Sequence, residues 1–106
     1  MLDPALLDQQ LKAKWTGMLT ALENSDAIAA ANQFSIHSHE GFKQEFESMQ
    51  QYLPAVAGKL SAPIHLVEIK ENRALYDLRI TSKGTEYSLQ LEMVKDEDGL
   101  WRIRTF

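Results

Sequence analysis

Cysteine is absent from this chain of 106 residues. Its absence excludes disulfide bonds, thiolate metal sites and cysteine nucleophiles, and leaves the redox compartment open. Glycine and proline are sparse, with five and three residues, and none of the glycines belongs to a phosphate-binding loop motif. No repeat or low-complexity tract divides the sequence, so we expect one domain spanning residues 1–106.

Basic residues are fewer than acidic ones: eleven Lys and Arg against fifteen Asp and Glu give a formal net charge of -4. The basic residues are scattered, which argues against nucleic acid or an anionic membrane surface as a partner. The longest apolar stretch is far shorter than the roughly 18 residues of a membrane span. Asp3 and Asp8 interrupt the apolar residues that a signal peptide would need. We expect a soluble protein, and export after removal of a leader stays open.

The first half of the chain has the period of amphipathic helices. Asp3-Pro4 suits an N-cap and a first-turn proline, and this helix should end at Glu23-Asn24. Its apolar stripe follows spacings of 4, 4, 3 and 4, at Leu7, Leu11, Trp15, Met18 and Leu22.

Two further helical segments are predicted before Pro63. An Ala-rich helix from about residue 26 to 33 has Asn24 or Ser25 as its cap. A third helix begins near Ser38, and Pro54 starts a short further turn. The side chains expected to face inward are Ile28, Ala31 and Phe34 in the second helix, and Phe42, Phe46, Met49 and Leu53 in the third.

The segment 64–106 is predicted to be a four-stranded antiparallel meander. Lys83-Gly84 lies between two alternating runs, 74–82 and 85–94, and suits a two-residue turn. That turn gives a central hairpin with one apolar face, in which the pairs are Ile80 with Tyr87, Leu78 with Leu89, Tyr76 with Leu91 and Ala74 with Met93.

The outer strands follow from two further turns. Glu71-Asn72 should place Ile69 opposite Ala74, Val67 opposite Tyr76 and His65 opposite Leu78. The loop at Asp96–Gly99 should place Met93 opposite Trp101 and Leu91 opposite Ile103, with Glu92 beside Arg102 on the outer face. We therefore expect an α+β fold of about three helices packed on a four-stranded sheet.

Two sequence motifs carry a resemblance. The run from Trp15 to Asp26 leads from a helix into a small second helix, and the run from Lys95 to Ile103 contains an Asp-Gly-x-Trp-x-Ile hairpin. This arrangement resembles the nuclear transport factor-like superfamily, in which a curved sheet wraps a long helix in a cystatin-like cone. The resemblance is closer to small bacterial members, many of which look like accessory domains of exported proteins.

Enzymes of that superfamily, such as ketosteroid isomerases, place Asp, His or Tyr groups inside the cone. In this chain the predicted register directs His65 to the inner face, and Tyr76, Tyr87, Trp15 and Trp101 could line a small-molecule pocket with two hydroxyl groups. The alternative, which we favour, is that the aromatic residues fill the core and His65 lies at the rim. No catalytic residue is predicted, and no cofactor is expected.

His37, His39 and Glu40 offer three potential metal ligands within four residues. A solvated loop is the simpler interpretation, because the sequence indicates no fourth ligand, and we predict no metal site.

The expected outer face of the sheet carries apolar residues among charges, which is typical of interaction surfaces. The candidates for an interface with a protein partner or a second copy are Ile64, Leu66, Leu75, Arg79, Arg102, Arg104 and Phe106. The sequence therefore favours a non-catalytic binding or assembly domain that acts through the outer sheet face, with dimerisation as one form. The alternative is a small-molecule binding protein, or a lyase or isomerase, that uses the interior of the cone.

Overall fold

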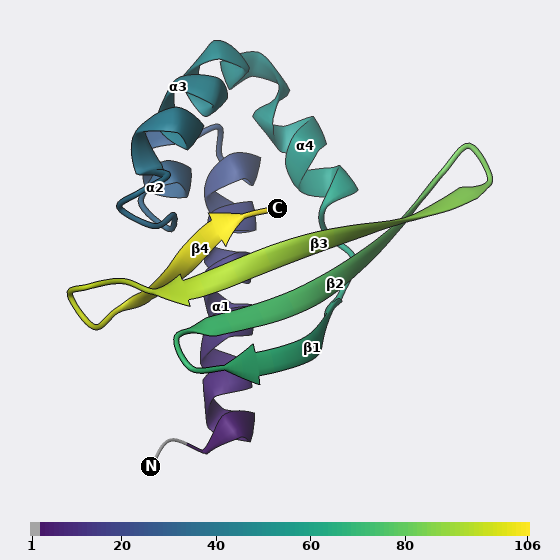
Figure 1. Cartoon of the computed structure of the whole chain (residues 1–106). Helices are drawn as coiled ribbons and strands as arrows, with labels where there is room; N and C mark the ends of the chain where they lie inside the picture. Colours follow the sequence, from purple (N-terminus) through teal and green to yellow (C-terminus); the bar gives the residue numbers. More distant parts are fainter. Residues whose placement is uncertain (1–2) are drawn as a thin grey trace.

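The computed structural model describes residues 3–106 as a cone in which helices cover one face of a curved antiparallel sheet (Figure 1). The sheet has the order β1-β2-β3-β4, as the meander prediction requires. The α+β class and the cystatin-like arrangement are therefore confirmed. Within the described residues, no helix is long and apolar enough to cross a membrane.

Helix α1 (Pro4–Glu23) lies against the concave face of the sheet (Figure 1). Its N-cap is Asp3, whose carboxylate accepts a hydrogen bond of 3.0 Å from the backbone N–H of Ala5. The five predicted stripe residues are all buried, at Leu7, Leu11, Trp15, Met18 and Leu22. The first helix was thus predicted correctly in both its ends and its buried face.

Helix α2 (Ala27–Ala31) is shorter than predicted, and its cap is Asp26 instead of Asn24 or Ser25. The Asp26 carboxylate accepts a hydrogen bond from Ala29, so the helix begins later and its buried face is turned. Ile28 is consequently 59% exposed, and the prediction that it faces inward is wrong. The inward placement of Ala31 and Phe34 is confirmed.

The predicted third helix is divided into three pieces. Helix α3 (His39–Ser48) is followed by a 3-10 turn (Gln50–Tyr52) and by α4 (Leu53–Lys59), which carries Pro54 in its first turn. Residues 3–106 therefore contain four α-helices where about three were expected. Phe46 and Leu53 are buried, whereas Phe42 and Met49 are half-buried against the core.

Strands β2 (Arg73–Ser82) and β3 (Thr85–Lys95) form the central hairpin. All four predicted pairs are present, from Ala74 with Met93 to Ile80 with Tyr87. Lys83 and Gly84 both have positive φ, at 52° and 78°, as a type I′ turn requires. Beyond Leu78 the hairpin projects past its neighbours as a two-stranded arm (Figure 1).

Strand β1 (Ile64–Lys70) contains a β-bulge that corrects the predicted register. Ile69 faces Ala74 as expected, but Val67 is an extra residue, so Leu66 pairs with Tyr76. A single extra residue moves the side chains on the far side of the bulge, here those of residues 64–66, to the opposite face of the sheet from the one predicted. His65 therefore pairs with Asp77 on the outer face, and Ile64 pairs with Leu78 and is buried, which reverses both predictions.

Strand β4 (Trp101–Thr105) contains a second irregularity, beside Glu92 and Met93. Trp101 pairs with Lys95, and Ile103 pairs with Met93. The pairing is therefore shifted by two residues from the predicted register, and because the shift is even, both side chains keep the predicted inner face. The bulge then turns Phe106 inward, where the centroid of its ring lies 5.6 Å from that of Trp15. The prediction that Phe106 lies on the outer face is therefore wrong.

The outer face is consequently almost entirely polar. Of the apolar interface candidates only Leu75 remains there, half-buried and opposite Glu92. Glu92 accepts hydrogen bonds from Arg104 and Arg73 in place of Arg102. The apolar patch predicted for this face does not form.

Candidate functional site

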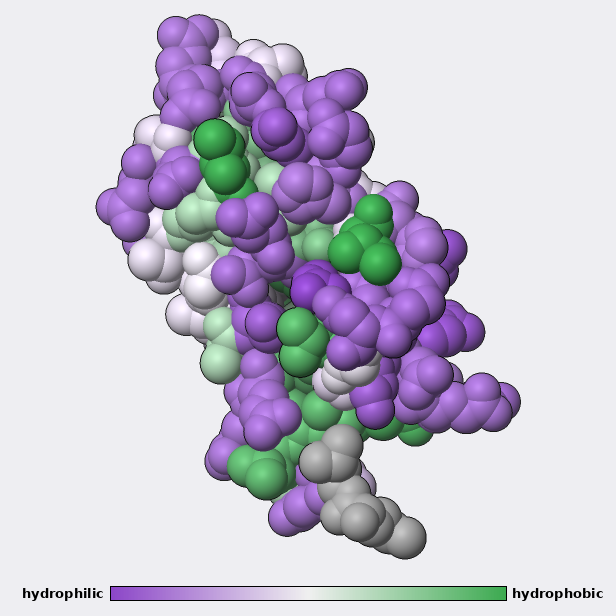
Figure 2. Space-filling model, turned by 90° about the vertical axis from the view of Figure 1, so that its left-hand side faces the viewer, coloured by the Kyte–Doolittle hydropathy of each residue, from purple (hydrophilic) through white to green (hydrophobic). Residues whose placement is uncertain are grey.

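An apolar groove lies at the mouth of the cone, between the beginning of α1 and the end of β1. Its volume is about 520 Å³. Hydrophobic atoms gather at this lower end of the molecule, beside the start of α1 (Figure 2). The apolar lining residues are Pro4, Leu7, Leu66, Val67, Ile69 and Trp101.

The β1 bulge creates the exposed part of this groove. Leu66 lies on the inner side of β1 and is 38% exposed, and the bulged Val67 is 62% exposed. Trp101 on β4 and Ile69 on β1 are half-buried beside them and pack against the core. The bulge thus leaves two neighbouring aliphatic side chains open to solvent beside the first turns of α1.

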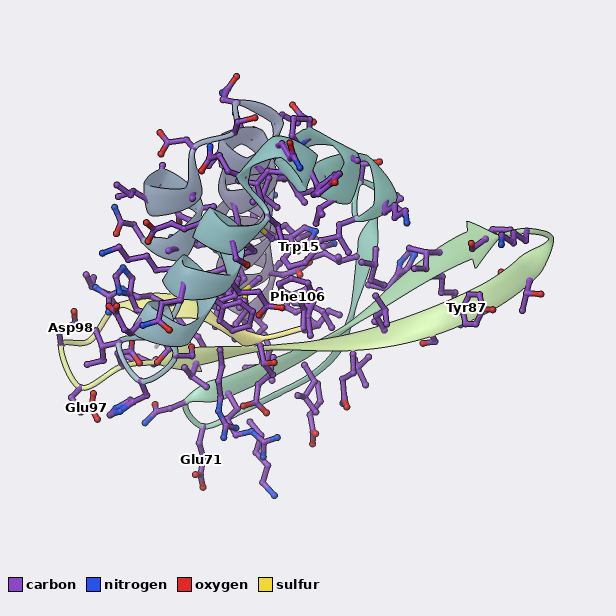
Figure 3. All side chains as sticks on the ribbon, turned by 90° about the horizontal axis from the view of Figure 1, so that it is seen from above. Trp15, Glu71, Tyr87, Glu97, Asp98 and Phe106 are labelled. Carbon is purple, nitrogen blue, oxygen red and sulfur yellow. The ribbon has the colours of Figure 1, made fainter. Side chains whose placement is uncertain are left out.

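The rim of the groove is polar. Glu68, Glu71, Asn72 and Lys95 complete the lining, and Glu71 extends outward from the β1–β2 turn (Figure 3). None of these four side chains makes a side-chain hydrogen bond within the described residues. Such a rim can orient an amphipathic ligand whose apolar part enters the groove.

The interior of the cone behind the groove is filled. Tyr76, Leu91, Met93 and Ile103 are fully buried, and Trp15 is only 3% exposed. The indole N–H groups of Trp15 and Trp101 are buried without an acceptor among the described residues, so packing sets the positions of both rings.

Tyr76 on β2 directs its hydroxyl group toward α1. Its hydroxyl donates a hydrogen bond of 2.6 Å to Asp8, which also forms an ion pair of 3.2 Å with Lys12. Burial, the hydrogen bond to Asp8 and its negative charge together raise the pKa of Tyr76 well above its ordinary value. The phenol therefore stays protonated and serves as a donor that ties α1 to β2.

The five pocket candidates do not converge on one cavity. Trp101 lines the groove, while Trp15 and Tyr76 are core residues. His65 lies on the outer face, and Tyr87 lies far away on the projecting arm (Figure 3). The sequence could not place Leu7, Val67 and Ile69 in the groove, because they meet only through the β1 bulge and the packing of α1 beside it.

A second cluster ties the β3–β4 loop to the segment between α2 and α3. Asp96, whose side chain is 1% exposed, accepts hydrogen bonds from Ser35 at 2.7 Å and from Arg102 at 2.9 Å. Ser35 donates to Oδ1, whereas Arg102 and the backbone N–H of Ile36 both donate to Oδ2, and Arg102 also pairs with Asp98. Burial alone raises the pKa of Asp96, but these hydrogen bonds outweigh it and hold the pKa below its usual value.

The same cluster contains the histidines considered as metal ligands. His37 contacts Glu97 at 2.6 Å, whereas His39 contacts Asn32 at 3.2 Å, so the set with Glu40 does not assemble. His37, Asp96 and Glu97 do place ligand atoms within 4.8 Å of one another. Both oxygens of Asp96 are already bonded to Ser35, Ile36 and Arg102, which gives this cluster a structural role.

Acid should destabilise the fold through these carboxylates. The pKa values of Asp96 and Glu92 are lowered in the folded chain, because hydrogen bonds from arginines and Ser35 outweigh the effect of burial. The folded state therefore binds fewer protons than the unfolded state, and its stability is fully present above the unfolded pKa of about 4. We expect urea midpoints that are level from about pH 7 to 5 and fall below about pH 4. A midpoint that rises on acidification would contradict this assignment.

Comparison with known proteins supports the class of fold that this geometry defines. A crystal structure of a candidate NTF2-like transpeptidase from Campylobacter jejuni is similar, with a TM-score of 0.55 and 13% sequence identity. The match covers 93% of this chain and 97% of that chain. At this identity the similarity shows the fold alone: the chain has an NTF2-like fold.

The sequence itself has no comparable match. No family model matches the chain. No curated protein matches it either.

Proposed function

We propose that this chain is a non-catalytic binding domain that holds an apolar group of a protein partner in the groove at the mouth of the cone. The observation that carries the proposal is the exposed pair Leu66 and Val67 beside Trp101 in a concave site. A concave apolar site rimmed by polar groups is typical of binding surfaces. The polar outer face of the sheet offers no such site, so the groove replaces it as the expected surface.

The chemistry of the groove supports binding and not catalysis. Its titratable lining groups are Glu68, Glu71 and Lys95, and all three are exposed at the rim. The buried Tyr76 hydroxyl is committed to Asp8 and has no exposed surface through which to touch a substrate. An open groove of this size accommodates one large side chain or a short acyl or aromatic group.

The expected occupant is an apolar side chain presented by an amphipathic peptide. The rim supports this choice, because Lys95 and the two glutamates can pair with charges that flank such a side chain. A free small molecule is the other source of the same apolar group, and the experiment separates the two.

Substitution of Leu66 by aspartate should abolish this binding. In ¹⁵N NMR titrations with short amphipathic peptides carrying Leu or Phe, and with decanoate, we expect saturable shifts of the Trp101 indole and of Ile69. Leu66→Asp should weaken them about tenfold or more, because a carboxylate would be buried without a partner. Decanoate shifting these signals more strongly than every peptide would favour the small-molecule alternative.

Matched variants separate loss of binding from loss of folding. Ile28→Asp changes an aliphatic residue that is 59% exposed on α2, away from the groove, and should leave the titrations unchanged. Val67→Asp changes a groove residue that is more exposed than Leu66 and should reproduce the loss without unfolding. Absence of any saturable shift at the groove in the folded wild type would refute the proposal.

A further inference from the structure

The arm formed by β2 and β3 exposes one long strand edge. Strand β4 pairs with β3 only from Glu92 to Lys95, so Thr85 to Leu91 has β2 on one side and no strand on the other. Within residues 3–106, no other backbone group is hydrogen-bonded to this edge. The arm is visible as the part of the sheet that extends beyond the helices (Figures 1 and 3).

The turn at Lys83-Gly84 determines which backbone groups face outward. In a two-residue turn of this type Ser82 and Thr85 bond each other, so alternation directs the odd-numbered residues of β3 toward β2. Two hydrogen bonds at the end of β3 follow this alternation. The backbone N–H of the odd-numbered Lys95 donates to Asn72, next to β2, at 2.9 Å, whereas that of the even-numbered Asp96 donates to Leu100 on the opposite side. Glu86, Ser88 and Gln90 therefore present unpaired N–H and C=O groups along the free edge.

This edge is complementary to itself. In an antiparallel pair with Tyr87 at a two-fold axis, Glu86 lies opposite the partner's Ser88, and Thr85 lies opposite the partner's Leu89. Tyr87 meets the partner's Tyr87, and it is 51% exposed in the single chain. No like charges are directly opposed, and aromatic cross-strand pairs stabilise such contacts.

Other registers are less favourable. An axis at Glu86 would place two carboxylates directly opposite each other, which is destabilising. An axis at Ser88 would bring the partner's Gly84 opposite Glu92, where Thr105 already pairs. The other edge of the arm is shorter, because β1 pairs with β2 as far as Leu78, and Ser61 and Ala62 lie beside it.

We propose that two copies of this chain form a two-fold dimer by antiparallel pairing of their β3 edges about Tyr87. The backbone N–H and C=O groups of Glu86 and Ser88 exchange their hydrogen bonds to water for hydrogen bonds to the partner's Ser88 and Glu86, and the two tyrosine rings cover each other at the axis. Gln90 lies opposite the partner's Gly84, at the end of the paired edge. This contact is independent of the groove, so the domain can dimerise and bind a partner at the same time.

The absence of cysteine makes single-thiol crosslinking a direct test. Opposed residues in a non-hydrogen-bonded antiparallel pair have Cα atoms about 4.5 Å apart, which a disulfide can span. Tyr87→Cys should thus form a covalent dimer under mild oxidation. Glu86→Cys and Ser88→Cys lie one residue away, and their Cα atoms would be at least about 7 Å from their own counterparts. Both should crosslink at least about tenfold more slowly.

Sedimentation of the unmodified chain completes the test. The weight-average mass should rise from 12.1 kDa toward twice that value as the concentration approaches about 1 mM. Tyr87→Lys should remain monomeric, because it places two ammonium groups opposite each other at the axis. The control Tyr52→Lys changes a tyrosine that is 59% exposed on the 3-10 turn, and it should dimerise like the wild type. A monomeric wild type at that concentration, or crosslinking no faster at residue 87 than at 86 and 88, would overturn the proposal.

Discussion

Replacing Phe34 with alanine should lower the free energy of unfolding by about 3 to 5 kcal/mol, as expected for truncation of a buried aromatic residue. Phe34 is 1% exposed, and its ring stacks on Phe42 with 4.0 Å between centroids. It also contacts Phe46 and Phe106, and its backbone bridges to Ile103 on β4. The substitution would therefore leave a cavity where α2, α3 and the last strand meet.

The matched control for this prediction is Tyr52→Ala. Tyr52 is an aromatic residue of similar size that is 59% exposed, so its truncation should change stability by no more than about 0.5 kcal/mol. Urea denaturation at neutral pH measures both variants. A loss below about 1 kcal/mol for Phe34→Ala would show that the aromatic cluster does not hold the helices to the sheet.

Replacing Asp96 with alanine should cost about 2 to 4 kcal/mol, less than a core truncation of Phe34 but more than any surface ion pair. The substitution leaves the hydroxyl of Ser35 and the backbone N–H of Ile36 without their acceptor in a nearly water-free position, and it removes one hydrogen bond of Arg102. The loss is moderated because Arg102 keeps its pairing with Asp98 at 2.8 Å.

Asp98→Ala is the matched control, because Asp98 is a loop carboxylate that binds the same arginine but has a side chain 44% exposed. It should cost at most about 1 kcal/mol, as surface pairs do. Asp96→Ala should also flatten the dependence of stability on pH below about pH 4, because a carboxyl with a lowered pKa has been removed. Equal losses for the two variants would show that burial of Asp96 does not matter.

Local sequence signals were sufficient for the centre of the molecule. The stripe of α1 has apolar residues at a helical period, and its cap and proline mark its start, so both its ends and its buried face were predictable. The Lys83-Gly84 turn determines the register of β2 and β3 because a two-residue loop leaves no freedom in pairing. Both signals act over a few neighbouring residues and need no knowledge of distant contacts.

The two outer strands were not predictable in the same way. Each contains a bulge, at Val67 in β1 and near Arg104 in β4, and each bulge reverses the faces of the residues beyond it. The adjacent apolar residues Leu66 and Val67 were the only sequence sign of the first bulge. The bulges turn Ile64 and Phe106 toward the core in place of His65 and Thr105. The apolar contacts that these two side chains then make with α1 and the aromatic cluster favour the bulges.

The sequence alone determined the class of fold, the order of its elements and the absence of thiol chemistry, because these depend on composition, period and turn residues. Only the tertiary structure decided the position of the candidate site. The groove combines Leu7, Leu66 and Trp101, which are remote in sequence, and their meeting depends on a bulge that is stabilised by packing of the whole cone. A local pattern cannot encode that choice, since the free energy that favours the bulge comes from side chains on other elements.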